Sequence, residues 1–157
     1  MKRVALLPLF LLLTFCAGGR GGDDTMSQPG HGAISIQVVP NPIVATNAGG
    51  GQYDFPFEVV IRETGGRPVT IDRVSANVLA LGSIPVANES YDAARIASLG
   101  YQTTVPANGE LRYRFTPRRE VSDDRLFGGV SAELSVEGRD DTGTAASART
   151  TVTVTRR

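Results

Sequence analysis

The stretch that decides the fold is Val130-Ser-Ala-Glu-Leu-Ser-Val-Glu137, in which apolar and polar residues alternate without interruption. Successive side chains of a β-strand point to opposite faces of the sheet. The period of two therefore predicts a strand that buries Val130, Ala132, Leu134 and Val136. A strand with one apolar and one polar row is typical of antiparallel sheets that bury a single face.

The residues that follow predict a hairpin. Glu137–Gly143 (EGRDDTG) is expected to form its turn, because Gly and Asp are favoured in turns. The last strand then places Ala146, Ala148, Val152 and Val154 on one side. This pair of strands sets the register for the end of the domain.

The same alternation recurs earlier in the chain. Phe55, Phe57, Val59 and Ile61 form the clearest inward row, and Pro56 on the outward row predicts an edge position or a local bulge. Two further runs alternate in the same way: Ile34, Ile36 and Val38, and then Leu111, Tyr113 and Phe115. Turn residues separate these runs, so the pattern is that of many short strands.

A change of phase marks the strand that runs from Val69 to about Leu81. Val69 and Ile71 share one phase, whereas Val74, Ala76 and Val78 share the other. One additional residue near Asp72-Arg73, relative to strict alternation, shifts the phase. Such a shift is typical of a β-bulge.

One stretch, Ser90–Gly100, has helical rather than alternating character. Asp92 is a candidate N-cap and Gly100 a candidate C-terminal glycine. We expect a short helix that crosses from one sheet to the other.

These elements predict an all-β domain, an antiparallel β-sandwich of about seven strands with one short helical crossover. Their order and spacing resemble the immunoglobulin-like domains of bacterial surface proteins, over residues 33–157. The hairpin Leu134–Gly143 is the most telling local match. The chain has no Trp and a single Cys, so the Cys–Trp–Cys core of antibody-type domains is absent. The resemblance implies adhesion, scaffolding or presentation at the cell envelope.

The N-terminus has the layout of an export signal. Met1-Lys2-Arg3 is positive, and Val4–Phe15 is an apolar run shorter than the roughly 20 residues that span a bilayer. Cys16, which ends the run, gives it a resemblance to the lipobox of bacterial lipoproteins, where the cysteine thiol is acylated. Leu13 matches that motif and Phe15 departs from it, since a small residue is usual there. The alternatives are an ordinary cleaved signal and, less favoured by so short a run, an uncleaved membrane anchor.

The resulting organisation has three parts: a signal peptide at 1–15, a flexible tether at 16–32 and the sandwich at 33–157. The tether is Gly-rich and polar, so it has little to bury. By the lipoprotein resemblance the protein is exported and anchored to the membrane through Cys16. Ala17 follows the cysteine where an aspartate signals inner-membrane retention, which favours the outer membrane if the host is Gram-negative.

Composition excludes several classes of activity. The 16 basic and 16 acidic residues cancel, so a driving force for nonspecific nucleic-acid binding is missing. The only histidine, His31, lies in the tether, and the only cysteine belongs to the signal. Nucleophilic catalysis needs a nucleophile beside a base. We therefore expect no enzyme activity and no cofactor.

Acidic turn residues raise the question of a cation site. Asp140 and Asp141, with Asp123 and Asp124, are the weak candidates for calcium. Calcium takes six or more oxygen ligands, so solvated turn acids that pair with arginines are the preferred interpretation, and no metal is expected. A calcium- or carbohydrate-binding accessory domain remains the alternative function.

The remaining candidates are binding residues. Arg118 and Arg119 lie in the charged connection Pro117–Arg125, which is either a docking loop or a solvated one. Tyr91 and Tyr101 flank the expected helix and are suited to an interface or to packing on a sheet edge.

The sequence thus predicts a lipid-anchored envelope protein whose sandwich is a non-catalytic binding, adhesion or scaffold module. Its partner is expected to be an envelope protein or a glycan. Arg112, Arg114 and Pro56 are expected to blunt the sheet edges, which predicts a monomer that sedimentation at several concentrations checks.

Overall fold

A computed structural model describes residues 30–80, 84–121, 127 and 129–156. Its elements in chain order are β1 (Ile34–Val39), β2 (Ile43–Gly49), β3 (Gln52–Asp54), β4 (Phe57–Glu63), β5 (Val69–Ala80), β6 (Ile84–Asp92), α1 (Ala93–Ser98), β7 (Thr104–Val105), β8 (Glu110–Phe115), β9 (Arg118–Glu120), β10 (Ser131–Asp140) and β11 (Ala145–Arg156).

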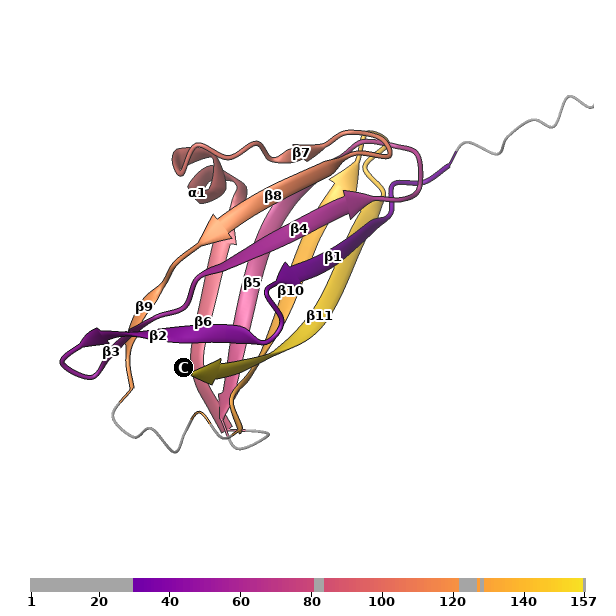
Figure 1. The fold of residues 1–157 in the computed structure, drawn as a ribbon. Coiled ribbons are helices and arrows are strands. Elements are labelled where there is room, and N and C mark those ends of the chain that lie inside the picture. Colours follow the sequence, from indigo (N-terminus) through magenta and orange to yellow (C-terminus); the bar gives the residue numbers. More distant parts are fainter. Residues whose placement is uncertain (1–29, 81–83, 122–126, 128, 157) are drawn as a thin grey trace, which may run out of the picture.

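The strands form two layers that face each other (Figure 1). One is a three-stranded sheet in the order β1-β4-β8, and the other has the order β6-β5-β10-β11-β2-β3-β9 with β7 added on β5. The predicted all-β, immunoglobulin-like sandwich with one helical crossover is confirmed, and in the described chain its strands are divided into eleven shorter ones. One pairing departs from the antiparallel expectation, because β2 runs parallel to β11.

The core lies between the two layers. It consists of side chains that both sheets point inward, nearly all of them apolar. Its fully buried members include Val59, Ile61, Ile71, Tyr113, Leu134, Val136 and Val152. Burial of this apolar surface supplies the main driving force for the fold.

The alternating row of β10 is confirmed, and it is longer than predicted. Ala132, Leu134 and Val136 are buried, and Gly138 and Asp140 continue the same buried row. The predicted turn at Glu137–Gly143 was wrong in its first half, because β10 stays paired with β5 up to Asp140. A composition rich in Gly and Asp indicated a turn, but the ladder of neighbouring strands held these residues extended.

The predicted bulge in β5 is confirmed. Across the β5–β10 pair, Glu137 lies opposite Arg73 and Gly138 lies opposite Ile71, so Asp72 is the additional residue. The bulge brings the backbone of β5 close to Gly138. A Cβ added at Gly138 would overlap the Thr70 carbonyl oxygen.

Gly138→Ala is therefore expected to destabilise the fold by about 2 kcal/mol, because the added methyl forces buried backbone apart. Urea unfolding followed by circular dichroism measures the change. Glu137→Ala is the matched control, since that residue is exposed and adjacent. Equal stability of the two variants would contradict the close approach at the bulge.

The row from Phe55 to Ile61 does not belong to one strand. The strand structure is interrupted between β3 and β4, and Pro56 lies at this interruption. The proline therefore separates two strands that belong to different sheets. The backbone N–H of Phe55 donates to the Pro117 carbonyl oxygen (3.0 Å). Val59 and Ile61 are buried as predicted.

A second switch between sheets lies at residues 40–42. β1 ends at Val39 in the small sheet, and β2 begins at Ile43 in the large one. Pro40 and Pro42 donate no backbone hydrogen bond, so neither continues the ladder of β1.

The predicted crossover helix is confirmed as α1, between β6 and β7. Asp92 caps its N-terminus, because its Oδ1 accepts from the backbone N–H of Arg95 (2.8 Å). Gly100 has a φ of 84°, a left-handed conformation that glycine adopts without strain. The helix and the segment after it carry the chain from the large sheet to β8 of the small one.

The outer face of β4 and β8 carries a ladder of charges. Arg112 pairs with Glu58 and Glu110, both at 2.6 Å, and Arg114 pairs with Glu58 at 2.9 Å. β8 is an end strand of its sheet, so these arginines lie on an edge, as expected. The hydrogen bonds from Arg114 and Arg112 hold the pKa of Glu58 below its usual range.

Candidate functional site

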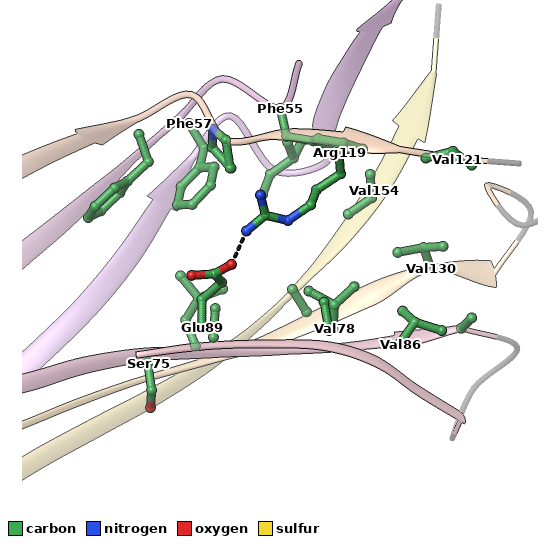
Figure 2. Close-up of a pocket in the computed structure, with 18 of the residues that line it drawn as sticks. Phe55, Phe57, Ser75, Val78, Val86, Glu89, Arg119, Val121, Val130 and Val154 are labelled. Carbon is green, nitrogen blue, oxygen red and sulfur yellow. Dashed lines mark hydrogen bonds and ion pairs between the residues drawn. The ribbon is translucent and has the colours of Figure 1, made fainter. Parts of the chain in front are cut away.

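A cavity of about 280 Å³ lies between the two sheets. Its walls come from β5, β6 and β10 of the large sheet on one side, and from β4, β8, β9 and their connections on the other. It is nearly all apolar, and its lining includes Phe55, Phe57, Val59, Val74, Ala76, Val78, Ala80, Val86, Ala87, Phe115, Val121, Phe127, Val130, Ala132, Leu134 and Val154. Figure 2 shows these side chains converging from both layers.

The cavity lies in the half of the sandwich that is remote from residue 30. Leu79 of β5 pairs with Ser131 of β10 at that end, whereas Val69 pairs with Asp140 at the other. The described chain begins near the second end, at the upper right of Figure 1. The cavity and the N-terminal entry of the chain are thus at opposite ends of the strands.

Aromatic rings from both walls line the cavity. The ring centroids of Phe57 and Phe115 lie 5.4 Å apart, and those of Tyr91 and Phe115 also lie 5.4 Å apart. Phe55 and Phe127 stack at 6.3 Å. Rings in these arrangements offer broad apolar surface with little freedom of movement.

One ion pair crosses the cavity, between Arg119 of β9 and Glu89 of β6 (Figure 2). Both side chains are partly exposed, at 48% and 32%. Ser75 also belongs to the lining, but its hydroxyl lies 2.7 Å from that of Ser135 and points away from the cavity in Figure 2. Glu120 is exposed and adds a second carboxylate to the lining.

Apolar side chains are exposed beside the cavity. Ile84 and Val86 of β6 are 53% and 54% exposed, and Val86 belongs to the lining. β6 and β9 are the two end strands in the order of the large sheet. Among the described residues, the ion pair joins these two end strands and no backbone pairing is formed between them.

The structure brings two of the predicted binding residues to this site, because Tyr91 and Arg119 line the cavity. The guanidinium of Arg95 lies over the Tyr91 ring, 4.3 Å from its centroid. Tyr101 lies next to the cavity, where its ring is 6.4 Å from that of Phe115 and its hydroxyl donates to the Arg114 carbonyl oxygen (2.8 Å). Both tyrosines pack on the edge of β8.

Arg118 does not line the cavity. It makes two hydrogen bonds to the carboxylate of Asp54, at 2.7 and 2.8 Å, and so ties β9 to β3. This bond to Arg118 holds the pKa of Asp54 below its usual range. The start of the charged connection is therefore a strand rather than a loop, in which Arg118 joins β9 to β3 and Arg119 faces the cavity.

Asp140 lies at the other end of the sandwich, where both of its carboxylate oxygens accept hydrogen bonds. Thr142 donates from its hydroxyl (2.6 Å) and its backbone, Thr144 donates from its backbone (2.9 Å), and so does Gly32 (2.9 Å). These bonds, led by that of the Thr142 hydroxyl, hold the pKa of Asp140 well below its usual range. Asp140 thus fastens the start of the domain to the β10–β11 turn.

Among the described acidic candidates, Asp141 does not join Asp140 in a cluster. Asp141 pairs with Arg67 at 2.7 Å. Asp123 and Asp124 lie outside the described residues. Within the described ranges, no three His, Cys, Asp or Glu side chains gather in a way that would hold a metal ion.

Sequence reasoning missed Glu63, the second carboxylate at this end. Glu63 accepts from the backbone N–H groups of Ala33 (3.1 Å), Gly65 (2.6 Å), Gly66 (2.9 Å) and Asn108 (2.8 Å). Burial raises the pKa of its carboxyl, but these four donors outweigh burial and lower the pKa to about 2. A charged residue at an inward position of the β4 row was the signal available in the sequence.

Comparisons with solved structures agree with the fold. A protein of Bordetella pertussis that carries the name ApaA matches with a TM-score of 0.57 at 11% identity, over 80% of this chain and 96% of that one. The structural-genomics target SoR45 matches with a TM-score of 0.53 at 10% identity, over 78% of this chain and 87% of that one. At such identities the likeness shows the fold alone.

Neither a protein-family model nor a curated protein matches the sequence. In the described part of the chain, no helix has the length and apolar character that crossing a bilayer requires.

Proposed function

We propose that this chain is a lipid-anchored protein of the cell envelope whose sandwich is a non-catalytic binding module. The observation that carries the proposal is the position of the apolar cavity. It lies in the half of the sandwich that is remote from residue 30, where the tether joins the domain. A site placed in this way is left accessible to a partner when the domain is held at its N-terminal end.

The rest of the proposal comes from the sequence. The signal at 1–15 and Cys16, with residues 17–29 of the tether, lie outside the described residues. An acyl group on Cys16 adds apolar surface that partitions into the bilayer, and a second acyl chain makes such anchoring stable. Export to the outer membrane of a Gram-negative host, and a partner that is an envelope protein or a glycan, are the corresponding parts of the proposal.

The last residues of the predicted tether are held to the sandwich. Gly32 is bonded to Asp140 and Ala33 to Glu63, and Gly32 has no space for a Cβ beside the Asp140 and Val69 side chains. These bonds fix the point from which the tether leaves the sandwich, at the end opposite the cavity.

The intact mass of the mature protein, extracted with detergent from its native membrane fraction, tests the anchor. We expect a chain that begins at Cys16 and carries added acyl groups. The full chain with Cys16→Ser is the control, and it is expected to lack that added mass. A wild-type mass without lipid would overturn the anchored function and leave a secreted binding domain.

A further inference from the structure

We propose that the cavity binds one linear acyl chain whose head group is polar but uncharged, such as a hydroxyl, and that this head group lies at the Arg119–Glu89 pair. This inference rests on the proposed function, because it names the class of ligand that the binding module takes. The ligand is a single-chain amphiphile, taken up apart from a bilayer.

The lining supports an apolar chain rather than a sugar or a peptide backbone. The walls consist of aliphatic and aromatic side chains, such as Phe57 and Leu134. The hydroxyl of Ser75 is hydrogen-bonded to that of Ser135 and does not face the cavity. A sugar or a peptide would bury hydrogen-bonding groups here without partners, which is costly. An acyl chain has no such groups to satisfy.

The size of the cavity sets the length of the chain. At about 280 Å³ it lies near the lower end of ligand pockets, which span roughly 300–1,000 Å³. A cavity of about 150 Å³ in another protein holds one benzene ring. By that measure the present cavity accommodates on the order of twelve carbon atoms.

The charges around the cavity favour an uncharged head group. The guanidinium of Arg119 is already paired with the carboxylate of Glu89, and Glu120 adds a second carboxylate. An anionic head group would lie near two carboxylates and only one guanidinium, so repulsion would outweigh attraction. A cationic head group would have to displace Arg119 from Glu89. A hydroxyl accepts from Arg119 and donates to Glu89 without separating them.

The exposed apolar residues show where the chain enters. Ile84 and Val86 lie on β6, the end strand that carries Glu89, and more than half of each is exposed. Because no backbone pairing joins β6 to β9 in the described strands, a ligand passes between these two strands without breaking a ladder there. The apolar residues beside this opening cover the first carbons of the chain.

The test is photolabelling of the full-length protein. The labelling is done in the cell fraction, membrane or soluble, in which the protein is found. The probe is a twelve-carbon alcohol that carries a diazirine and an alkyne, and peptide mass spectrometry locates the adduct. We expect labelling of cavity residues on β5, β6 or β10. Unlabelled dodecanol is expected to halve the labelling at about tenfold lower concentration than dodecanoate or dodecyltrimethylammonium does. The reason is that only the charged head groups disturb the Arg119–Glu89 ion pair.

Two charge variants test the head group in opposite directions. Glu89→Gln frees Arg119, so competition by dodecanoate is expected to improve about tenfold. Arg119→Gln leaves two carboxylates, so competition by dodecyltrimethylammonium is expected to improve instead. A gain of binding cannot come from a chain that has failed to fold. Arg118→Gln is the matched control, because Arg118 is bonded to Asp54 and does not line the cavity.

A pair of variants on β6 tests the tail. Ala87→Phe fills the cavity and is expected to abolish labelling, whereas Asn88→Phe adds the same ring at an exposed neighbour that does not line it. A photoreactive two-chain phosphatidylglycerol in vesicles tests the alternative source of the chain. If this lipid labels the cavity with the same yield as the twelve-carbon alcohol, the proposal that the cavity takes up a single-chain ligand is wrong.

The outcomes separate this inference from the proposed function. A lipidated chain that takes no label in the cavity overturns the acyl ligand and leaves the anchored binding module. The other outcome is a protein that carries no lipid but is labelled in the cavity and changes its head-group preference in the charge variants. That result supports the acyl ligand and contradicts the lipid anchor. Equal competition by all three head groups in every variant overturns the role of the ion pair.

Discussion

Glu63→Ala is expected to lower the free energy of unfolding by about 3–5 kcal/mol, because it leaves four backbone N–H groups without their acceptor. The carboxylate that they share is only 3% exposed. Those donors come from three separate segments: the start of β1, the β4–β5 turn and the turn before β8. The loss therefore loosens the whole end of the sandwich that holds the N-terminus.

Urea unfolding at neutral pH measures this effect. Glu133→Ala is the control, because that carboxylate is 45% exposed and lies 3.6 Å from its partner Arg149. Exposed pairs of this kind contribute about 0–1 kcal/mol. A Glu63→Ala variant as stable as the control would show that the four hydrogen bonds do not support the fold.

The same carboxyl makes stability depend on acid pH. The pKa of Glu63 falls from 4.5 to about 2 on folding, so the unfolded chain binds this proton first. Its contribution is complete above about pH 4.5 and is lost as the pH falls through about 2. Glu63→Gln is expected to flatten this part of the stability profile relative to the wild type.

Tyr113→Ala is the second large effect, with an expected loss of about 3–5 kcal/mol. Tyr113 is the largest of the fully buried side chains and is 1% exposed. Its ring lies 5.2 Å from that of Tyr101, and its hydroxyl donates to the Gln102 carbonyl oxygen (2.8 Å). The residue thus anchors the crossover segment after α1 to the core.

Tyr113→Phe separates packing from hydrogen bonding. It keeps the ring and removes the hydroxyl, so a loss of about 1 kcal/mol is expected. Burial raises the pKa of Tyr113 to about 12, and its contribution to stability is complete below about pH 10 and is lost as the pH rises through about 12. Chemical unfolding between pH 9 and pH 12 is expected to show this fall in the wild type and less of it in the Phe variant.

Much of the fold was predictable because local pattern and tertiary structure agree. The row of Ala132, Leu134 and Val136, the bulge at Asp72 and the capped helix at Asp92 all appear where the sequence placed them. Each depends on a rule that acts within a few residues: alternation, a slip of phase or a side chain that caps its own helix.

The errors arose where partners distant in sequence decided the structure. The Gly- and Asp-rich run after Val136 stays extended because β5 lies beside it. Pro56 marks the interruption of the row through Phe55, but only the distant partners show that its two halves join different sheets. The Phe55 N–H donates to the carbonyl oxygen of Pro117, 62 residues further along the chain. Composition and local alternation do not contain this information.

The candidate site shows the same division. The sequence singled out Arg119 and Tyr91 as exposed residues of suitable type, but it did not indicate that they line one cavity. Glu89, the partner of Arg119, lies 30 residues before it and on another strand. The alternating, two-layered β fold follows from the order of the residues alone, because the side-chain period decides which face of each strand is buried. The place of the remaining apolar space, and the charges beside it, come from the packing of the whole chain, because both depend on how the edges of two separate sheets meet.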